Sequence, residues 1–174
     1  MNPKSCLMSA QLGLLPAVCL PQPAATPRSP LHYWLAAGVG KSSVGFVAGS
    51  AALCVQAHSL LVSARGTASS SQLLGGKEYY DLGLAAGYVW HSHTVRVGAG
   101  TGCALVTGAE FRGNPLFGGG EWVKKGPVLG MSLEGQLQVL LSSFLALGLY
   151  GYADLNGLAP FSGVTVTLIL GRLR

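Results

Sequence analysis

The stretch Val128–Leu141, VLGMSLEGQLQVLL, alternates apolar residues with polar or very small ones. Successive side chains of a β-strand leave opposite faces, so this alternation predicts a strand with one apolar and one polar face. The stretch Leu145–Asn156, LALGLYGYADLN, repeats the pattern, with leucines on one face and two tyrosines and Asp154 on the other.

The same period of two residues recurs along the chain after residue 30. It predicts eight strands, at His32–Lys41, Gly45–Gln56, Leu60–Ala68, Tyr79–Trp90, Thr94–Gly108, Val128–Leu141, Leu145–Asn156 and Phe161–Leu173. The apolar row of each strand is the more continuous one, and the opposite row mixes glycine with polar and charged residues. Lipid outside a closed barrel accounts for both rows. We therefore predict an all-β fold, an eight-stranded antiparallel up-and-down transmembrane β-barrel.

Composition supports this interpretation. Only 10% of the 174 residues are charged, whereas about a quarter are charged in a typical soluble domain. No uninterrupted apolar run reaches the roughly 18 residues that a membrane-spanning helix needs. The 26 glycines suit the narrow interior of a small barrel. The net charge of +5 is scattered and not interleaved with aromatic residues, so the sequence indicates no nucleic-acid-binding surface.

Five charged residues share the inward phase of the predicted strands. They are Arg65, Asp81, Arg96, Glu134 and Asp154. An unpaired buried charge is costly, so we expect these residues to form an ion-pair network that fills the lumen. Gln136, Gln138, Tyr150 and Tyr152 are expected to complete its hydrogen bonds. The alternative is that these are solvent-exposed charges of a soluble sheet.

Loop lengths predict which end of the barrel faces outward. On one side all three connections are short turns, whereas on the other side Ser69–Lys77 and Ala109–Gly126 are long, Gly157–Pro160 is intermediate and Ser42–Val44 is a short exception. Outer-membrane barrels have short periplasmic turns and longer extracellular loops. Both chain ends are then expected on the periplasmic side. Tyr33, Tyr88 and Trp90 at one level and Tyr80 at the other fit the aromatic belts at the two membrane interfaces.

The 18-residue segment Ala109–Gly126 is the main candidate for surface interaction, because binding residues concentrate on long loops of rigid scaffolds. Its candidate contact residues are Phe111, Phe117, Trp122, Lys124 and Lys125. Aromatic rings and lysines suit glycans, lipopolysaccharide or another protein. The alternative is a loop that only folds over the mouth of the barrel.

Residues 1–30 are expected to lie outside the barrel, which occupies residues 31–174. Lys4 precedes an apolar stretch from Cys6 to Leu20, and a proline-rich segment follows. This order predicts a signal peptide, with a disordered tail or a misassigned start as alternatives. In the barrel, Cys54 has the inward phase and Cys103 the outward phase, so a disulfide between them is not expected.

From Tyr33 to Arg174 the chain resembles small eight-stranded outer-membrane β-barrels of Gram-negative bacteria. It is similar to an uncharacterised group that opens with a segment such as YWLAAGVGKSSVGFVAGSAAL and closes with LGLYGYADLN and GVTVTLILGRLR. The resemblance implies contact with outer-membrane lipids and lipopolysaccharide, assembly by the barrel-insertion machinery, and no specific activity. Such barrels commonly end on an aromatic residue, whereas this chain ends Leu173-Arg174.

Other motifs give weaker indications of function. Gly38–Ser43 is similar to the end of a phosphate-binding loop, but the segment after it has the phase of a strand and not of a helix. The histidines at positions 32, 58, 91 and 93 all fall on the predicted periplasmic rim, where His91 and His93 offer a pair of metal ligands; turn residues are the preferred interpretation. We therefore expect no metal and no cofactor.

Two further functions stay open as alternatives. One is a soluble small β-barrel that binds an apolar ligand in its lumen. The other is a lipid A-modifying enzyme, but every histidine lies at the rim opposite the long loops, so no general base is expected near the outer-leaflet substrate. The preferred interpretation is a non-enzymatic outer-membrane barrel with a filled lumen and a structural or surface-interaction role.

Overall fold

The fold is given by a computed structural model that describes residues 31–71, 76–114, 119–158 and 160–174. These residues form eight strands: β1 (His32–Ser42), β2 (Val47–Ala57), β3 (Leu60–Ser70), β4 (Lys77–His91), β5 (Val95–Asn114), β6 (Gly119–Leu140), β7 (Leu145–Leu155) and β8 (Phe161–Arg172). Residues 1–30, for which a signal peptide is expected, lie outside the described part of the chain. No helix long and apolar enough to cross a membrane occurs within the described residues.

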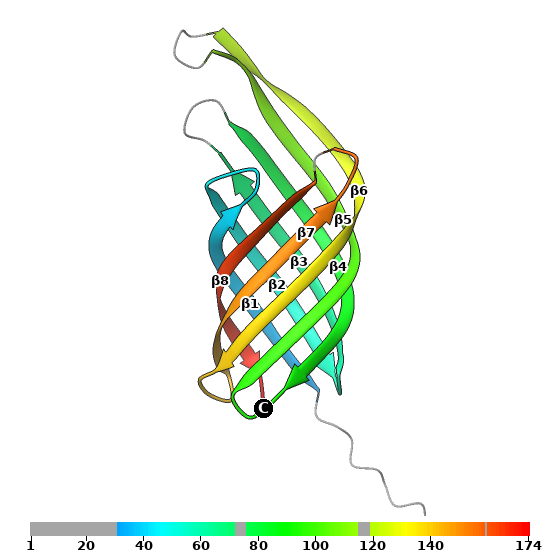
Figure 1. Cartoon of the computed structure of the whole chain (residues 1–174), viewed down its shortest axis with the longest axis vertical. Coiled ribbons are helices and arrows are strands. Elements are labelled where there is room, and N and C mark those ends of the chain that lie inside the picture. The colour runs from blue at the N-terminus through cyan, green and yellow to red at the C-terminus, as the bar shows by residue number, and fades with distance from the viewer. Residues whose placement is uncertain (1–30, 72–75, 115–118, 159) are drawn as a thin grey trace, which may run out of the picture.

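Each strand pairs antiparallel with its neighbours in sequence, and β1 pairs with β8 to close the barrel. The predicted fold class is thereby confirmed. The C-terminus lies at the same end as the turns β2–β3, β4–β5 and β6–β7, which we call the turn end (Figure 1). At the opposite end, the hairpin end, the paired tips of β5 and β6 project beyond the other strands (Figure 1).

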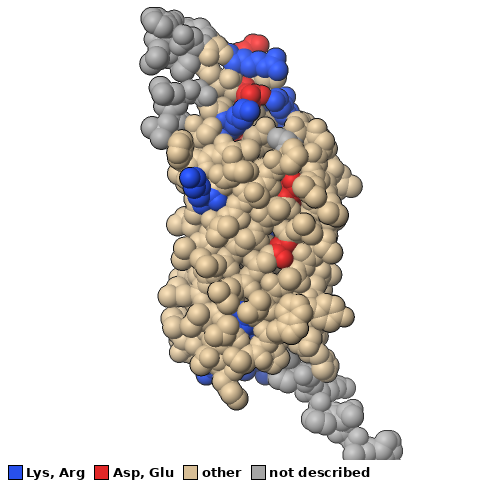
Figure 2. All heavy atoms as spheres, in the orientation of Figure 1, with Lys and Arg blue, Asp and Glu red and all other residues tan. Residues whose placement is uncertain are grey.

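The outer wall of the barrel is apolar. Along β4, Leu82, Leu84 and Tyr88 are each more than 60% exposed, whereas Asp81 and Ala85, which have the opposite phase, are buried. The other strands repeat this alternation, which places leucine and valine on the outside. Charged residues gather toward the hairpin end, and the wall below them is mostly uncharged (Figure 2). The predicted inside and outside phases are therefore those of the structure.

The prediction that Ala109–Gly126 forms a loop is wrong, because most of this segment belongs to strands. Strand β5 continues to Asn114 and β6 begins at Gly119, and their register runs from Gly108 opposite Lys125 to Asn114 opposite Gly119. A register shift between Val106 and Gly108 marks the base of this hairpin, and β5 stays paired with β4 up to Glu110 opposite Lys77. Beyond the wall both faces of the hairpin meet water, so the sequence there has no reason to alternate apolar with polar residues.

The interior is packed in layers along the barrel axis. At the turn end an apolar cluster includes Trp34, Leu61, Val89, Leu140 and Ile169. At the hairpin end an aromatic cluster contains Tyr79, Tyr150, Tyr152 and Phe161. Polar and charged side chains lie between the two clusters. The sequence indicated the polar layer but not the apolar cluster, because its residues have the inward phase otherwise occupied by polar residues.

Glycines make room for the largest side chains of the lumen. Gly83 lies directly opposite Arg65 in the strand register, and Gly163 lies opposite Tyr152. A Cβ atom added to Gly83 would lie 2.8 Å from Arg65 Nε, and one added to Gly163 would lie within 3 Å of the Tyr152 ring. Pairing glycine with a bulky neighbour lets an eight-stranded barrel enclose side chains that its narrow interior would otherwise exclude.

Candidate functional sites

Arg65 on β3 is the centre of a buried charge cluster in the middle of the lumen. Its Nη2 atom lies 2.7 Å from Asp81 Oδ2 of β4 and forms a second ion pair with Asp154 of β7. Its Nε atom lies 2.9 Å from Glu134 Oε1 of β6. Side chains of four strands are thus joined through one guanidinium. Because three carboxylates surround a single cation, removing that cation would leave only negative charge in this layer.

Neighbouring hydroxyl groups complete the hydrogen bonds of the cluster. Ser63 donates a hydrogen bond to Glu134 over 2.7 Å, and Arg65 donates one to Ser132 over 2.8 Å. The backbone N–H and hydroxyl of Thr67 both donate to Asp81. Such bonds lower the cost of burying charge, since the ions exchange water for fixed protein partners.

The glutamine and tyrosine residues that were expected to complete the hydrogen bonds of the cluster make contacts of two kinds, hydrogen bonds between amides and contacts of aromatic rings. The Tyr152 ring lies 5.1 Å from the centre of the Arg65 guanidinium and so contacts it through its face. The amide of Gln138 donates a hydrogen bond to Gln136 over 2.7 Å. Tyr150 packs beside Tyr152, with ring centroids 6.4 Å apart. Cation–π contact and aromatic packing thus take the place of the hydrogen bonds expected from Tyr150 and Tyr152, whose hydroxyl groups have no hydrogen-bond partner among the described residues.

Arg96 differs from the expected network. It is buried on β5, but its guanidinium lies 4.8 Å from the Trp34 ring and donates a hydrogen bond to the Leu173 carbonyl over 2.6 Å. Within the described residues it forms no ion pair with a carboxylate. The physical reason is position, since Arg96 is the second residue of β5 and lies at the turn end, one apolar layer away from the carboxylates. Alternation revealed its inward phase but not its height along the axis.

The β5–β6 hairpin is the second candidate site. Phe111 and Trp122 face each other across the two strands, with ring centroids 5.6 Å apart in an edge-to-face arrangement. Glu110 forms ion pairs with Lys125 and with Lys77 of β4. The bonds from the two lysines lower the pKa of Glu110 below its usual value. Lys124 is exposed, and Phe117 lies outside the described residues.

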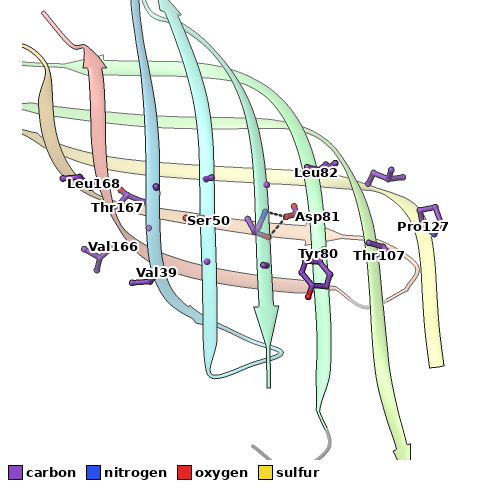
Figure 3. Close-up of a pocket in the computed structure, with 18 of the residues that line it drawn as sticks. Val39, Ser50, Tyr80, Asp81, Leu82, Thr107, Pro127, Val166, Thr167 and Leu168 are labelled. Atoms are coloured by element: carbon purple, nitrogen blue, oxygen red, sulfur yellow. Dashed lines mark hydrogen bonds between the residues drawn. The ribbon is translucent and has the colours of Figure 1, made fainter. Parts of the chain in front are cut away.

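A depression in the apolar outer wall spans β1, β2 and β3. Its floor is small because Ala37, Ala51 and Gly66 form one register row, beside a second row that contains Gly49 and Ala68. Figure 3 shows Val39, Val166 and Leu168 on one side of it and Tyr80 and Leu82 on the other. The shape and apolar lining suit acyl chains of the surrounding lipid.

Other sequence-predicted features have no catalytic arrangement in the structure. Strand β1 extends through the glycines of the segment Gly38–Ser43, and a turn follows it where a phosphate-binding loop would need a helix. His32, His91 and His93 lie together at the turn end. No group of three potential metal ligands occurs among the described residues. Cys54 is buried in the lumen and Cys103 is exposed on the wall, so the two thiols occupy opposite faces.

No protein-family model matches this chain, and no curated protein matches it significantly. Solved structures do match its fold. Neisserial surface protein A has a TM-score of 0.62 at 11% identity, over 82% of this chain and 96% of that protein. The N-terminal β-barrel domain of Pseudomonas aeruginosa OprF has a TM-score of 0.59 at 6% identity, over 80% and 96%. Ail of Yersinia pestis, determined in a phospholipid bilayer nanodisc, has a TM-score of 0.52 at 10% identity, over 80% and 98%.

The chain has the fold of the small eight-stranded outer-membrane β-barrels. The family-level resemblance inferred from alternation is confirmed at the level of fold. Identities of 6–11% carry over no activity or ligand from these proteins.

Proposed function

We propose that this chain is an outer-membrane β-barrel protein with a side-chain-filled lumen and a structural or surface-interaction role. The observation that carries the proposal is the distribution of polarity. Leucine, valine and aromatic side chains cover the outside, and the Arg65 cluster is buried inside. A soluble barrel that carries an apolar ligand needs the reverse arrangement, because its outer wall must be hydrated.

The height of the apolar wall supports insertion in the outer membrane. Tyr80 and Trp90 are exposed near opposite ends of β4, ten residues apart. At about 3.3 Å per residue and a tilt of about 40°, they are about 25 Å apart along the barrel axis. The apolar band of outer-membrane barrels has this height, and aromatic girdles flank it. Tyr33 and Tyr88 lie at the level of Trp90 and belong to the same girdle.

The proposed orientation places the turn end in the periplasm and the β5–β6 hairpin outside the cell. Short turns on one side and a projecting hairpin on the other are typical of these barrels. Insertion by the barrel-assembly machinery is part of this proposal. The layered interior supports a closed barrel without a water-filled channel, because apolar and aromatic clusters close both ends of the charged layer.

The surface role is assigned to the hairpin, with lipopolysaccharide as the proposed partner. Trp122 and Lys124 are exposed next to the membrane surface, where they combine an aromatic ring with a cation. Sugars stack on aromatic rings, and lysine pairs with phosphate groups. No catalytic role is proposed, because the three clustered histidines lie at the other end of the barrel from this hairpin.

Membrane fractionation combined with gel migration tests the proposal. The full chain is expected in the outer-membrane fraction, and its band is expected to shift between unheated and boiled samples, because folded barrels resist detergent until heated. Recovery in the cytosol with no heat-dependent shift would contradict the membrane assignment.

The lipopolysaccharide role needs a separate test. The full chain is reconstituted in vesicles with and without lipopolysaccharide, and the hydrogen exchange of hairpin amides is measured. Lipopolysaccharide is expected to slow exchange in the wild type and to slow it less in Lys124→Gln, with Lys41→Gln on β1 as the charge-matched control. Equal protection in all three proteins would reject this role for the hairpin and leave the barrel assignment intact.

A further inference from the structure

The turn end of the barrel contains a pocket whose charged and titratable side chains are all basic. A hollow of about 500 Å³ is lined by His32, His91 and His93 together with Arg96 and Arg174, and no carboxylate side chain lines it. This pocket is distinct from the hairpin and from the Arg65 cluster. It therefore takes no part in the function proposed above.

Arg96 lines this pocket, and its guanidinium lies over the Trp34 ring but has no carboxylate counterion among the described residues. Its side chain belongs to a residue that is only 2% exposed, and its Nη2 atom is bonded to the Leu173 carbonyl. Its Nε and Nη1 atoms have no hydrogen-bond partner among the described residues. The carboxylates of the lumen are engaged by Arg65, one layer away. A buried guanidinium in this condition is costly, and an anion beside it removes the cost.

The groups around Arg96 supply further donors. His91 lies directly opposite Arg96 in the β4–β5 register. The Nδ1 atom of His32 is buried and without a partner among the described residues. Arg174 is exposed at the mouth of the pocket, where its guanidinium donates a hydrogen bond to the His93 carbonyl over 2.6 Å. Guanidinium and imidazole N–H groups together suit the oxygens of a phosphate group, whereas two guanidiniums disfavour a metal cation.

We propose that the turn-end pocket binds a phosphate-class oxyanion, with Arg96 as the buried counterion and His32, His91 and Arg174 around it. The group belongs either to a free phosphate or to the phosphate of a phospholipid headgroup in the adjacent leaflet. Both sources share the chemistry that the pocket recognises.

The test measures anion binding to the folded full chain in a maltoside detergent, which contains no phosphate. Inorganic phosphate is added at constant ionic strength, and the Arg96 Nε–H signal is followed by NMR together with calorimetry. We expect saturable binding in the wild type. Arg96→Gln is expected to weaken it at least tenfold, and Arg112→Gln in the hairpin, the charge-matched control, is expected to leave it unchanged.

Two additional arms make the test decisive. Arg174→Gln, at the exposed mouth of the pocket, is expected to weaken binding several-fold, which keeps the test valid if the Arg96 variant fails to show the heat-dependent gel shift of a folded barrel. Phosphatidylglycerol added to the micelles identifies the source, since saturation by lipid alone indicates a headgroup and saturation by inorganic phosphate alone indicates a free anion. No saturable response to either probe, or equal affinity in wild type and Arg174→Gln, would overturn the proposal.

Discussion

Strands β5 and β6 belong to the barrel wall over most of their length and to the projecting hairpin at their tips, and their sequences differ between the two regions. Below the register shift at Val106 and Gly108, each strand separates lipid from a packed lumen, and its residues alternate accordingly. Beyond Glu110, where the pairing of β5 with β4 ends, the two strands still pair up to Asn114 opposite Gly119, but both faces meet water. Apolar and polar residues therefore alternate only where the two faces of a strand meet different environments, and a strand with water on both faces shows no such alternation. Substitutions in the wall should therefore change the free energy of unfolding of the whole barrel, whereas substitutions in the hairpin should change the stability of the hairpin alone.

The largest effect is expected when the charged layer loses Arg65, the one cation among its described residues. Arg65→Met leaves Asp81, Glu134 and Asp154 buried without their partner, and breaking a buried ion pair in this way costs about 3–5 kcal/mol. Urea unfolding in detergent micelles measures the loss. Arg112→Met in the exposed hairpin is the matched control, with an expected change within about 0.5 kcal/mol. Equal stabilities of the two variants would refute the structural role of the cluster.

A charge on the lipid face should destabilise according to its depth. Leu149→Arg places a guanidinium on the outward face of β7 near the middle of the strand, where the cost is about 2–4 kcal/mol near the middle of the membrane. The same substitution at Leu155, the last residue of β7, is expected to cost about 0–1 kcal/mol, since it lies near the interface. Folding yields in vesicles compare the two. A larger loss of folding yield for the Leu155 variant would mean that the membrane covers a different part of the barrel from the one proposed here.

Gly83→Ala tests whether glycine makes space for Arg65. The added Cβ would lie 2.8 Å from Arg65 Nε, so we expect a loss of about 1–3 kcal/mol from overpacking. Gly135→Ala on β6 is the control, because a Cβ there meets nothing within 4 Å. Urea unfolding should separate the two variants. If both variants have the same free energy of unfolding as the wild type, Gly83 is not needed to make space for the Arg65 side chain.

The smallest effect is expected in the hairpin and depends on pH. The pKa of Glu110 is lowered by its bonds with Lys125 and Lys77. A lowered pKa stabilises the folded form at pH values above the usual glutamate pKa of about 4.3, and this stabilisation is lost as the pH falls through the lower folded value. Amide exchange in the hairpin should accelerate on such acidification while exchange in the wall does not. Glu110→Gln should abolish the dependence; an unchanged profile in that variant would assign it to another group.

The sequence predicts the fold wherever the two faces of a strand meet different environments, because only there do apolar and polar residues alternate. The eight strands and the inward phase of Arg65, Arg96 and Glu134 follow from alternation alone. The height of a residue along the axis does not, because it depends on register and tilt. The sequence therefore paired Arg96 with carboxylates that lie one layer away.

The candidate sites were less predictable than the fold. Phe111 and Trp122 were selected as surface residues, but their edge-to-face contact depends on strand pairing in a glycine-rich segment with no alternation. The basic pocket was missed as well. His91 at the end of β4 and His93 in the turn after it lie next to Arg96 through the β4–β5 hairpin, whereas His32 at the start of β1 reaches the pocket only through closure of the barrel. The one available signal was that every histidine falls at the same rim.

The membrane assignment requires that lipid acyl chains contact the leucine-rich outer face of each strand, while the inner face lies in the lumen away from lipid. Nuclear Overhauser effects between lipid acyl protons and protein methyl groups, measured on the full chain in lipid nanodiscs, test it most directly. The account predicts strong effects from acyl chains to the methyl groups of Leu149 and Leu168, which are exposed, and none to those of Ala104 and Ile169, which are buried. Acyl contacts at Ala104 and Ile169 with none at Leu149 and Leu168 would contradict it.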